Sequence, residues 1–202
     1  FWVVKLNASG STIEWGFRIG SYVGDDHAYD VVEIPQSQGG GYYVVGDYDV
    51  YRQWDYFAIK ISSDGKLIWE RFLGGGGNDH ATSVDVTSDG GCIIAGYSNS
   101  YYGDITNNHG GYDYWVVKID KESEIEWQRS YGGLGDDRAF SVQAISRGSG
   151  GYMVAGYSNS KDGDVTGNHG QYDYWLLKLK SDGSIDWEKS YGNSGEQKAY
   201  CV

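Results

Sequence analysis

The strongest constraint on this chain is an internal repeat of about 55 to 60 residues that runs through its whole length. Segments that begin with an aromatic residue and end in lysine plus an aliphatic residue start at Trp2, Phe57, Trp115 and Trp175. The same register is kept by a second tryptophan and by an alanine, at Trp15, Trp69, Trp127, Trp187, Ala28, Ala81, Ala139 and Ala199. Self-similarity at a fixed spacing indicates a fold assembled from copies of one supersecondary unit.

Each repeat contains four short segments with the composition of β-strands. Examples are residues 139–142, 152–157, 115–119 and 125–129. They are rich in valine, isoleucine, tyrosine and tryptophan, and they are too short for a helix of ordinary length. Several connections contain Asp-Gly pairs, which favour the tight turns that join antiparallel strands. The repeat unit is therefore predicted to be a four-stranded antiparallel meander.

We therefore predict an all-β fold, a β-propeller built of four-stranded antiparallel blades, because such sheets need neighbours on both faces. Residues 1–24 supply the last two strands of one blade, residues 25–74, 75–133 and 134–192 are full blades, and residues 193–202 supply the first strand of another. About three and a half blades are present by this count. We expect the chain to be part of a larger ring and to self-associate through open blade ends.

Composition limits the classes of partner. The 28 acidic residues outnumber the 16 basic ones and give a net charge of −12, which repels the phosphate backbone of nucleic acids. The longest apolar runs, such as residues 1–4, are four residues long and exclude a membrane-spanning helix. Cys92 and Cys201 match neither a disulfide framework nor a zinc-ligand pattern. We expect neither nucleic acid as a partner nor a membrane span.

One stretch of the repeat resembles a known group of proteins. Residues 150–160 read Gly-Gly-Tyr-Met-Val-Ala-Gly-Tyr-Ser-Asn-Ser, residues 163–170 read Gly-Asp-Val-Thr-Gly-Asn-His-Gly, and Asp-Tyr-Trp follows at 173–175. This pattern resembles the repeat of large secreted or cell-surface propeller proteins of bacteria and archaea, which are similar in layout to kelch-like propellers. The resemblance implies an extracellular or cell-surface β-propeller and brings no catalytic motif with it.

The sequence departs from this repeat at two places. Around residues 47–55 the first complete repeat lacks eight residues of the loop between its second and third strands. Residues 196–198 are Glu-Gln-Lys, where the other repeats have Asp-Asp-His, Asn-Asp-His or Asp-Asp-Arg. Any site built from these loops is expected to be absent or altered there.

The loops between the second and third strands contain the candidate metal ligands. Oxygen-bearing side chains stand at alternate positions, as in calcium-binding loops, at Asp104, Thr106, Asn108, Asp113, Asp164, Thr166, Asn168 and Asp173. Calcium takes six to eight oxygen ligands, and His109 and His169 stand where an EF-hand loop has glycine. The alternative is that these side chains form hydrogen bonds with their own backbone in turns. Both interpretations, a calcium site and self-capped turns, are open at this point.

Aspartates before the first strand of each blade are candidate catalytic groups. Asp79 and Asp137 lie in the motifs at 77–80 and 135–138, and paired carboxylates perform acid and base chemistry in glycoside hydrolysis. The alternative is that each aspartate accepts hydrogen bonds from the backbone where the blade begins. The structural role is the one we expect.

Aromatic residues in the loops are candidate ligand contacts. They are Tyr48, Tyr51, Trp54, Tyr101, Tyr102, Tyr112 and Tyr172, close in sequence to asparagine and aspartate. Such a mixture stacks on sugars or anchors protein partners, and the alternative is that some of these rings pack between blades. The third-strand lysines Lys5, Lys60, Lys118 and Lys178 recur in every repeat, so we expect an architectural role for them.

The sequence predicts a non-catalytic, extracellular repeat module that binds a protein or a glycan at its loop rim. No nucleophile elbow, phosphate-binding loop or Cys/His/Asn set occurs in the chain. Two alternatives are kept. One is a hydrolase acting on polysaccharides, and the other is a structural repeat of a surface layer or filament.

Overall fold

The computed structural model describes residues 1–20, 24–50, 53–148 and 150–201. Within them, the β-strands are β1 Trp2–Leu6, β2 Ile13–Arg18, β3 His27–Glu33, β4 Tyr42–Val50, β5 Gln53–Ile61, β6 Leu67–Leu73, β7 Asp79–Val86, β8 Cys92–Ser98, β9 Asp113–Ile119, β10 Ile125–Tyr131, β11 Asp137–Ala144, β12 Tyr152–Ser158, β13 Asp173–Leu179 and β14 Ile185–Tyr191. One short 3₁₀ helix, η1 Gln36–Gln38, lies between β3 and β4.

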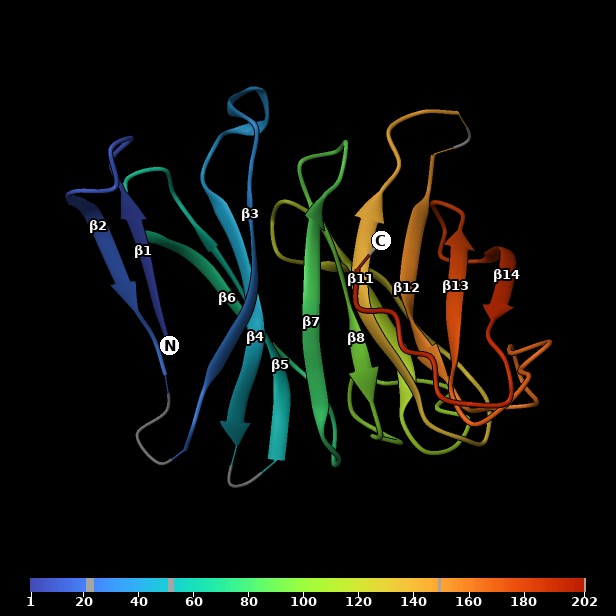
Figure 1. The fold of residues 1–202 in the computed structure, drawn as a ribbon. Helices are drawn as coiled ribbons and strands as arrows, with labels where there is room; N and C mark the ends of the chain where they lie inside the picture. Colours follow the sequence, from blue (N-terminus) through green and yellow to red (C-terminus); the bar gives the residue numbers. More distant parts are fainter. Residues whose placement is uncertain (21–23, 51–52, 149, 202) are drawn as a thin grey trace.

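The strands form three four-stranded antiparallel sheets and one two-stranded sheet. In sequence order these are β1–β2, then β3 to β6 (blade one), β7 to β10 (blade two) and β11 to β14 (blade three). Consecutive strands are hydrogen-bonded neighbours in every sheet, so each blade is a meander. Figure 1 shows the sheets standing side by side, with β3, β7 and β11 along one side of the stack. The prediction of an all-β fold with propeller-like blades is confirmed, and the described sheets do not close into a ring.

The first strand of each blade contains a β-bulge at the same position. Pairing shifts between Ala81 and Ser83 in β7, and the equivalent shifts occur in β3 and β11. Gly96 of β8 lies opposite Ala81, and a Cβ on this glycine would overlap the carbonyl oxygen of His80. The same Cβ would stand 2.6 Å from the hydroxyl of Tyr56, which reaches in from blade one. The glycine at this position, which is Gly46, Gly96 and Gly156 in the three blades, is therefore required for the blades to pack this closely.

Tyrosine hydroxyls tie the third strands of neighbouring blades together. Tyr56 donates to the carbonyl of Trp115 at 2.8 Å, and Tyr114 donates to the carbonyl of Trp175 at 2.9 Å. These four rings are all fully buried. Burial also raises the pKa of both tyrosines well above the ordinary value, so the hydroxyls remain protonated donors. The core of the protein is thus the set of interfaces between blades.

The repeated lysines have the architectural role expected for them. The ammonium of Lys118 contacts Asp89 at 2.8 Å and Glu126 at 3.1 Å, and its side chain is almost fully buried. Lys178 donates to the carbonyl oxygens of Gly150 and Leu179. Lys118 and Lys178 therefore place their charges at a strand end.

The two ends of the described stack differ from the middle. In the two-stranded sheet, Trp2 is 58% exposed and Leu6 is 48% exposed. Residues 193–201, for which we predicted a first strand, form no strand; Glu196 makes one isolated bridge with Tyr172. After β14 this segment returns towards β11 (Figure 1), where the ring of Tyr200 lies 5.0 Å from that of Phe140. No helix in the described part of the chain is long and apolar enough to cross a membrane.

The bulge geometry predicts that Gly96→Ala destabilises the protein. The added methyl meets backbone on one side and a buried hydroxyl on the other, so we expect the free energy of unfolding to fall by about 1 to 3 kcal/mol or more. Urea denaturation followed by tryptophan fluorescence measures this change. Gly195→Ala is the control, because the nearest side-chain atom would lie 3.3 Å from its Cβ. Equal stability of the two variants would contradict the proposed close approach.

Candidate functional site

The candidate site is the rim formed by the loops between the second and third strands of each blade. We define the rim loops as residues 99–112 in blade two and 159–172 in blade three. In blade one the loop is replaced by a hairpin, because β4 extends to Val50 and β5 begins at Gln53. The eight missing residues of the sequence repeat therefore remove a rim loop and lengthen two strands.

A buried aspartate begins the first strand of blades two and three. Asp137 is fully buried, and one of its carboxylate oxygens accepts hydrogen bonds from the amide of Gly133 at 2.8 Å and the hydroxyl of Ser160 at 2.8 Å. Asp79 makes the same contacts with Gly75 and Ser100. The carboxylate therefore satisfies backbone donors in the turn between two blades.

Residue 197 repeats this geometry with a neutral side chain. The side-chain carbonyl of Gln197 accepts the amide of Asn193 at 2.7 Å, four residues earlier, as Asp137 accepts that of Gly133. A glutamine that takes the place of the aspartate retains the acceptor but not the acid. This comparison supports the structural role that we expected for Asp79 and Asp137.

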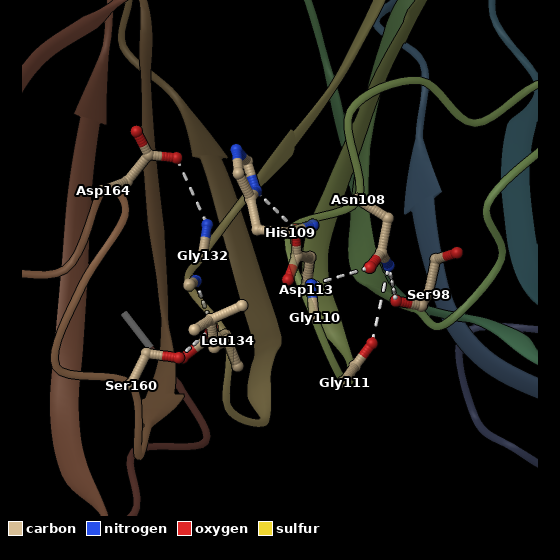
Figure 2. Close-up of polar contacts among 12 residues, drawn as sticks. Ser98, Asn108, His109, Gly110, Gly111, Asp113, Gly132, Leu134, Ser160 and Asp164 are labelled. Atoms are coloured by element: carbon tan, nitrogen blue, oxygen red, sulfur yellow. Dashed lines mark hydrogen bonds and ion pairs between the residues drawn. The ribbon is translucent and has the colours of Figure 1, made fainter.

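Each rim loop is attached to the preceding blade through an aspartate. Asp164 donates its amide to the carbonyl of Gly132 at 2.9 Å and accepts the amide of Gly132 on its carboxylate at 3.2 Å (Figure 2). Asp104 makes the same two hydrogen bonds with Gly74. These predicted calcium ligands thus act as latches between neighbouring blades.

The predicted threonine ligands bond to the outer strand of their own blade. Thr106 Oγ1 accepts a hydrogen bond from the Gln128 amide at 2.8 Å, and Gln128 Oε1 accepts the indole N–H of Trp115 at 2.9 Å. The equivalent trio in blade three is Thr166, Glu188 and Trp175. In blade one the rim loop is missing and Phe57, which has no N–H to satisfy, replaces the tryptophan.

The last two predicted ligands of each loop close a turn onto a buried carboxylate. Asn108 donates to the carbonyl of Ser98 and accepts the amide of Gly110 (Figure 2). Asp113, which is fully buried, accepts both the backbone amide of His109 at 2.8 Å and its ring Nδ1 at 2.7 Å. Asn168, His169 and Asp173 repeat these contacts in blade three.

The eight predicted calcium ligands are therefore held in separate hydrogen bonds. No group of three or more histidine, cysteine, aspartate or glutamate side chains in the described ranges is arranged to hold a metal ion. Asn108 and Asn168 bond to the backbone of their own turns, which was the alternative interpretation, whereas Asp104 and Asp164 bond to the preceding blade. Calcium binding stays a prediction from the sequence.

Carboxyl groups from adjacent blades approach each other beside Gly132, the residue that Asp164 binds. Asp113 Oδ1 and Asp137 Oδ2 lie 2.7 and 2.5 Å from the point where a Cβ on Gly132 would stand. Burial raises the pKa of Asp113 to about 6 and also raises the pKa of Asp137. Asp55 beside Asp79 repeats the arrangement, with its pKa raised to about 6 by burial. Asp79 and Asp137 are fully buried.

Some of the predicted ligand-binding aromatics pack between blades. The guanidinium of Arg138 in β11 lies 5.1 Å from the ring centre of Tyr97 and 4.3 Å from that of Tyr112, both in blade two. Lys198 repeats this with Tyr172, at 4.4 Å. These cation–π contacts stabilise the junction and cover one face of each ring.

At the junction between blades one and two, a hydrogen bond between histidine and aspartate takes the equivalent place. His80 Nδ1 lies 2.7 Å from the buried carboxylate of Asp47, and the ring of Trp54 lies 6.3 Å from that of His80. Tyr48 packs edge-on against Phe72 within blade one. Tyr51 lies outside the described residues.

Tyr101 and Tyr102 are the predicted contacts that remain exposed on the rim. Their side chains are 67% and 69% exposed, and Leu134 in the neighbouring turn is 74% exposed. The hydroxyl of Tyr101 donates to the carbonyl of Gly110, and Gly110 lies directly against the backbone of Leu134. We call Tyr101, Tyr102 and Leu134 the rim patch. The sequence did not indicate Leu134 as a contact residue, because it lies in a turn and not in a strand with alternating hydrophobic residues.

No protein-family model matches the chain, and no curated protein matches it in sequence. The repeated four-stranded sheets support a propeller-like class. The kelch-like and secreted assignments stay proposals.

The raised pKa of Asp113 predicts that the protein becomes more stable as the pH falls from 7.5 to 5. An unfolded aspartate titrates near 3.9, so between about pH 4 and 6 only the folded state binds this proton, and the stabilisation is lost as the pH rises through the folded pKa of about 6. We expect this group to contribute about 1 kcal/mol to the free energy of unfolding by urea. The Asp113→Asn variant cannot titrate at this position, so its stability should rise less between pH 7.5 and pH 5. An equal rise in the variant and the native protein would contradict the raised pKa of Asp113.

Proposed function

We propose that this chain is a non-catalytic binding module of the propeller type that engages a protein or a glycan through its rim. The observation that carries this proposal is the contrast in exposure at one end of the blades. The rim patch presents two tyrosines and a leucine to solvent, while Asp113 and Asp137 beside it are buried. Exposed aromatic residues next to polar loops are suited to stacking on sugars and to anchoring protein partners.

We further propose that the module acts outside the cell or at the cell surface. The net charge of −12 favours solubility and disfavours nucleic acid, and the repeat resembles those of secreted propellers. A hydrolase is less favoured, since Gln197 fills the place of Asp79 and Asp137 without changing the local hydrogen bond. A structural array is the second candidate, because four-stranded sheets repeat in series along the chain.

Calcium would act in this proposal by bracing the rim loops. Asp104 and Asp164 already join neighbouring blades, and a cation there would offset the negative charge of the carboxylates. Millimolar calcium should then raise the midpoint of thermal unfolding. At a calcium concentration one hundred times the dissociation constant, the free energy of unfolding should rise by about 2.7 kcal/mol. Magnesium should do much less, because it demands compact octahedral geometry. The double variant Asp104→Asn and Asp164→Asn should show no rise in the midpoint with calcium. If a chelator leaves the midpoint of the native protein unchanged, the calcium proposal is wrong.

The binding function is tested by removing the aromatic part of the rim patch. Tyr101→Ser with Tyr102→Ser should weaken binding to a glycan array, or to purified cell-surface proteins, at least tenfold. Ile68→Ser is the matched control, because Ile68 is 54% exposed on β6, away from the rim loops. Equal binding by the two variants would overturn the rim as the contact surface. Light scattering on the same samples detects polymers, whose persistence in both variants would favour the structural array.

A further inference from the structure

A cleft of about 510 Å³ opens between blades two and three, on the side of the outer strands. The rim loop of blade two and strand β10 form one wall, and the rim loop and the last turn of blade three form the other. Its lining combines an indole with polar side chains of both signs: Thr106, His109, Trp127, Gln128, Arg129 and Asp164. The volume is in the range of small-molecule sites.

Arg129 enters the cleft with most of its donors unused. Its guanidinium donates to the carbonyl of Asp182 at 3.2 Å, the one hydrogen bond that it makes within the described residues. The equivalent Arg71 in blade one is occupied, because it donates to Ser123 and forms an ion pair with Glu124 at 2.7 Å. Ser184 stands at the repeat position of Glu124, so Arg129 has no carboxylate partner there.

His109 is oriented so that one ring nitrogen is available. Its Nδ1 is bound to Asp113 Oδ2, as Figure 2 shows, which leaves Nε2 without a hydrogen-bond partner among the described residues. Asp164 holds the Gly132 amide with one carboxylate oxygen, and its other oxygen is free of that contact (Figure 2). Donors and acceptors therefore face the same cleft from both blades.

Trp127 contributes to the apolar surface of the cleft, together with Tyr131 and Ile185. Its indole N–H donates to the carbonyl of Ser181 at 3.0 Å, and its ring packs on Gly183, whose Cβ would stand 2.9 Å away. The tryptophan is thus fixed across the junction. A rigid aromatic ring beside planar polar groups is the combination that receives the C–H face and the hydroxyls of a sugar.

We propose that this cleft binds a pyranose ring of a glycan, with Arg129 and His109 bonding its oxygens and Trp127 packing against its carbon face. The inference rests on the proposed binding function and names its ligand class. It adds a contact in the cleft to the one proposed at the rim patch. Among the junctions that the described residues form, this one combines a rim loop on the preceding blade with an arginine that has no carboxylate partner.

The repeat provides matched variants for the test. His109→Gln and Arg129→Gln alter the cleft, whereas His169→Gln and Arg71→Gln remove equivalent side chains elsewhere; His169 makes the same bonds to Asp173 as His109 makes to Asp113. Cellobiose and digalacturonate serve as neutral and acidic probes. Binding is followed by saturation-transfer NMR and by the shift of the Trp127 indole N–H resonance, and thermal unfolding confirms that all variants fold.

We expect at least one probe to bind the native protein and to lose at least tenfold in affinity in each cleft variant, with both controls unchanged. Binding of the acidic probe alone would identify a carboxylate as the partner of Arg129. Absence of binding by both probes, or equal losses in the control variants, would overturn the cleft as a sugar site. If the cleft variants bind normally while the tyrosine variants of the rim patch lose binding, the cleft fails and the proposed rim function stands.

Discussion

The fold depends on satisfying the backbone where one blade ends and the next begins. A turn buried between sheets leaves N–H groups that water cannot reach, and each costs free energy unless it finds an acceptor. Asp79 and Asp137 provide that acceptor from inside the junction, and Gln197 does so without a charge. For Asp137, the hydrogen bonds from an amide and from a serine hydroxyl offset the free-energy cost of burying the carboxylate. Side chains that resemble a catalytic pair are therefore explained by the geometry of stacking.

The rim loops extend the same principle from one junction to the next. Asp104 and Asp164 bind backward to the preceding blade, while the end of each loop contacts the blade that follows. Within blade two, Gln128 accepts the indole N–H of Trp115 and donates to Thr106. Blade one lacks both the rim loop and the tryptophan, and the side chain of Phe57 at that position needs no acceptor. A rim loop is thus one side of a polar network that begins in the core. The side chains left for a ligand are those outside this network.

The repeat in the sequence was sufficient to predict the strands of residues 1–192 and their grouping into blades, because periodic Trp, Lys and Ala markers report local pairing, but the strand predicted after them does not form. It also correctly favoured a structural role for the lysines. It could not show that Tyr112 and Tyr172 cover basic side chains, since those contacts join residues from different blades. Nor could it show that Arg71 has a carboxylate partner and Arg129 has none. The turn that faces Arg71 carries Glu124, whereas the turn that faces Arg129 carries Ser184. Sequence spacing gives the position of a side chain within a blade, but its partners come from the neighbouring one.

The contacts that differ between junctions also specify the order of the blades. Repeated sheets with identical edges could stack in the wrong sequence or exchange between chains, a common failure in repeat proteins. The bonds made by Tyr56 and Tyr114 are equivalent and carry no information about which blade follows which. The pair of His80 with Asp47 does carry it, because Arg138 and Lys198 meet tyrosines instead. A misplaced blade two would separate His80 from the buried Asp47 carboxylate, so this contact distinguishes the junction between blades one and two from the next one.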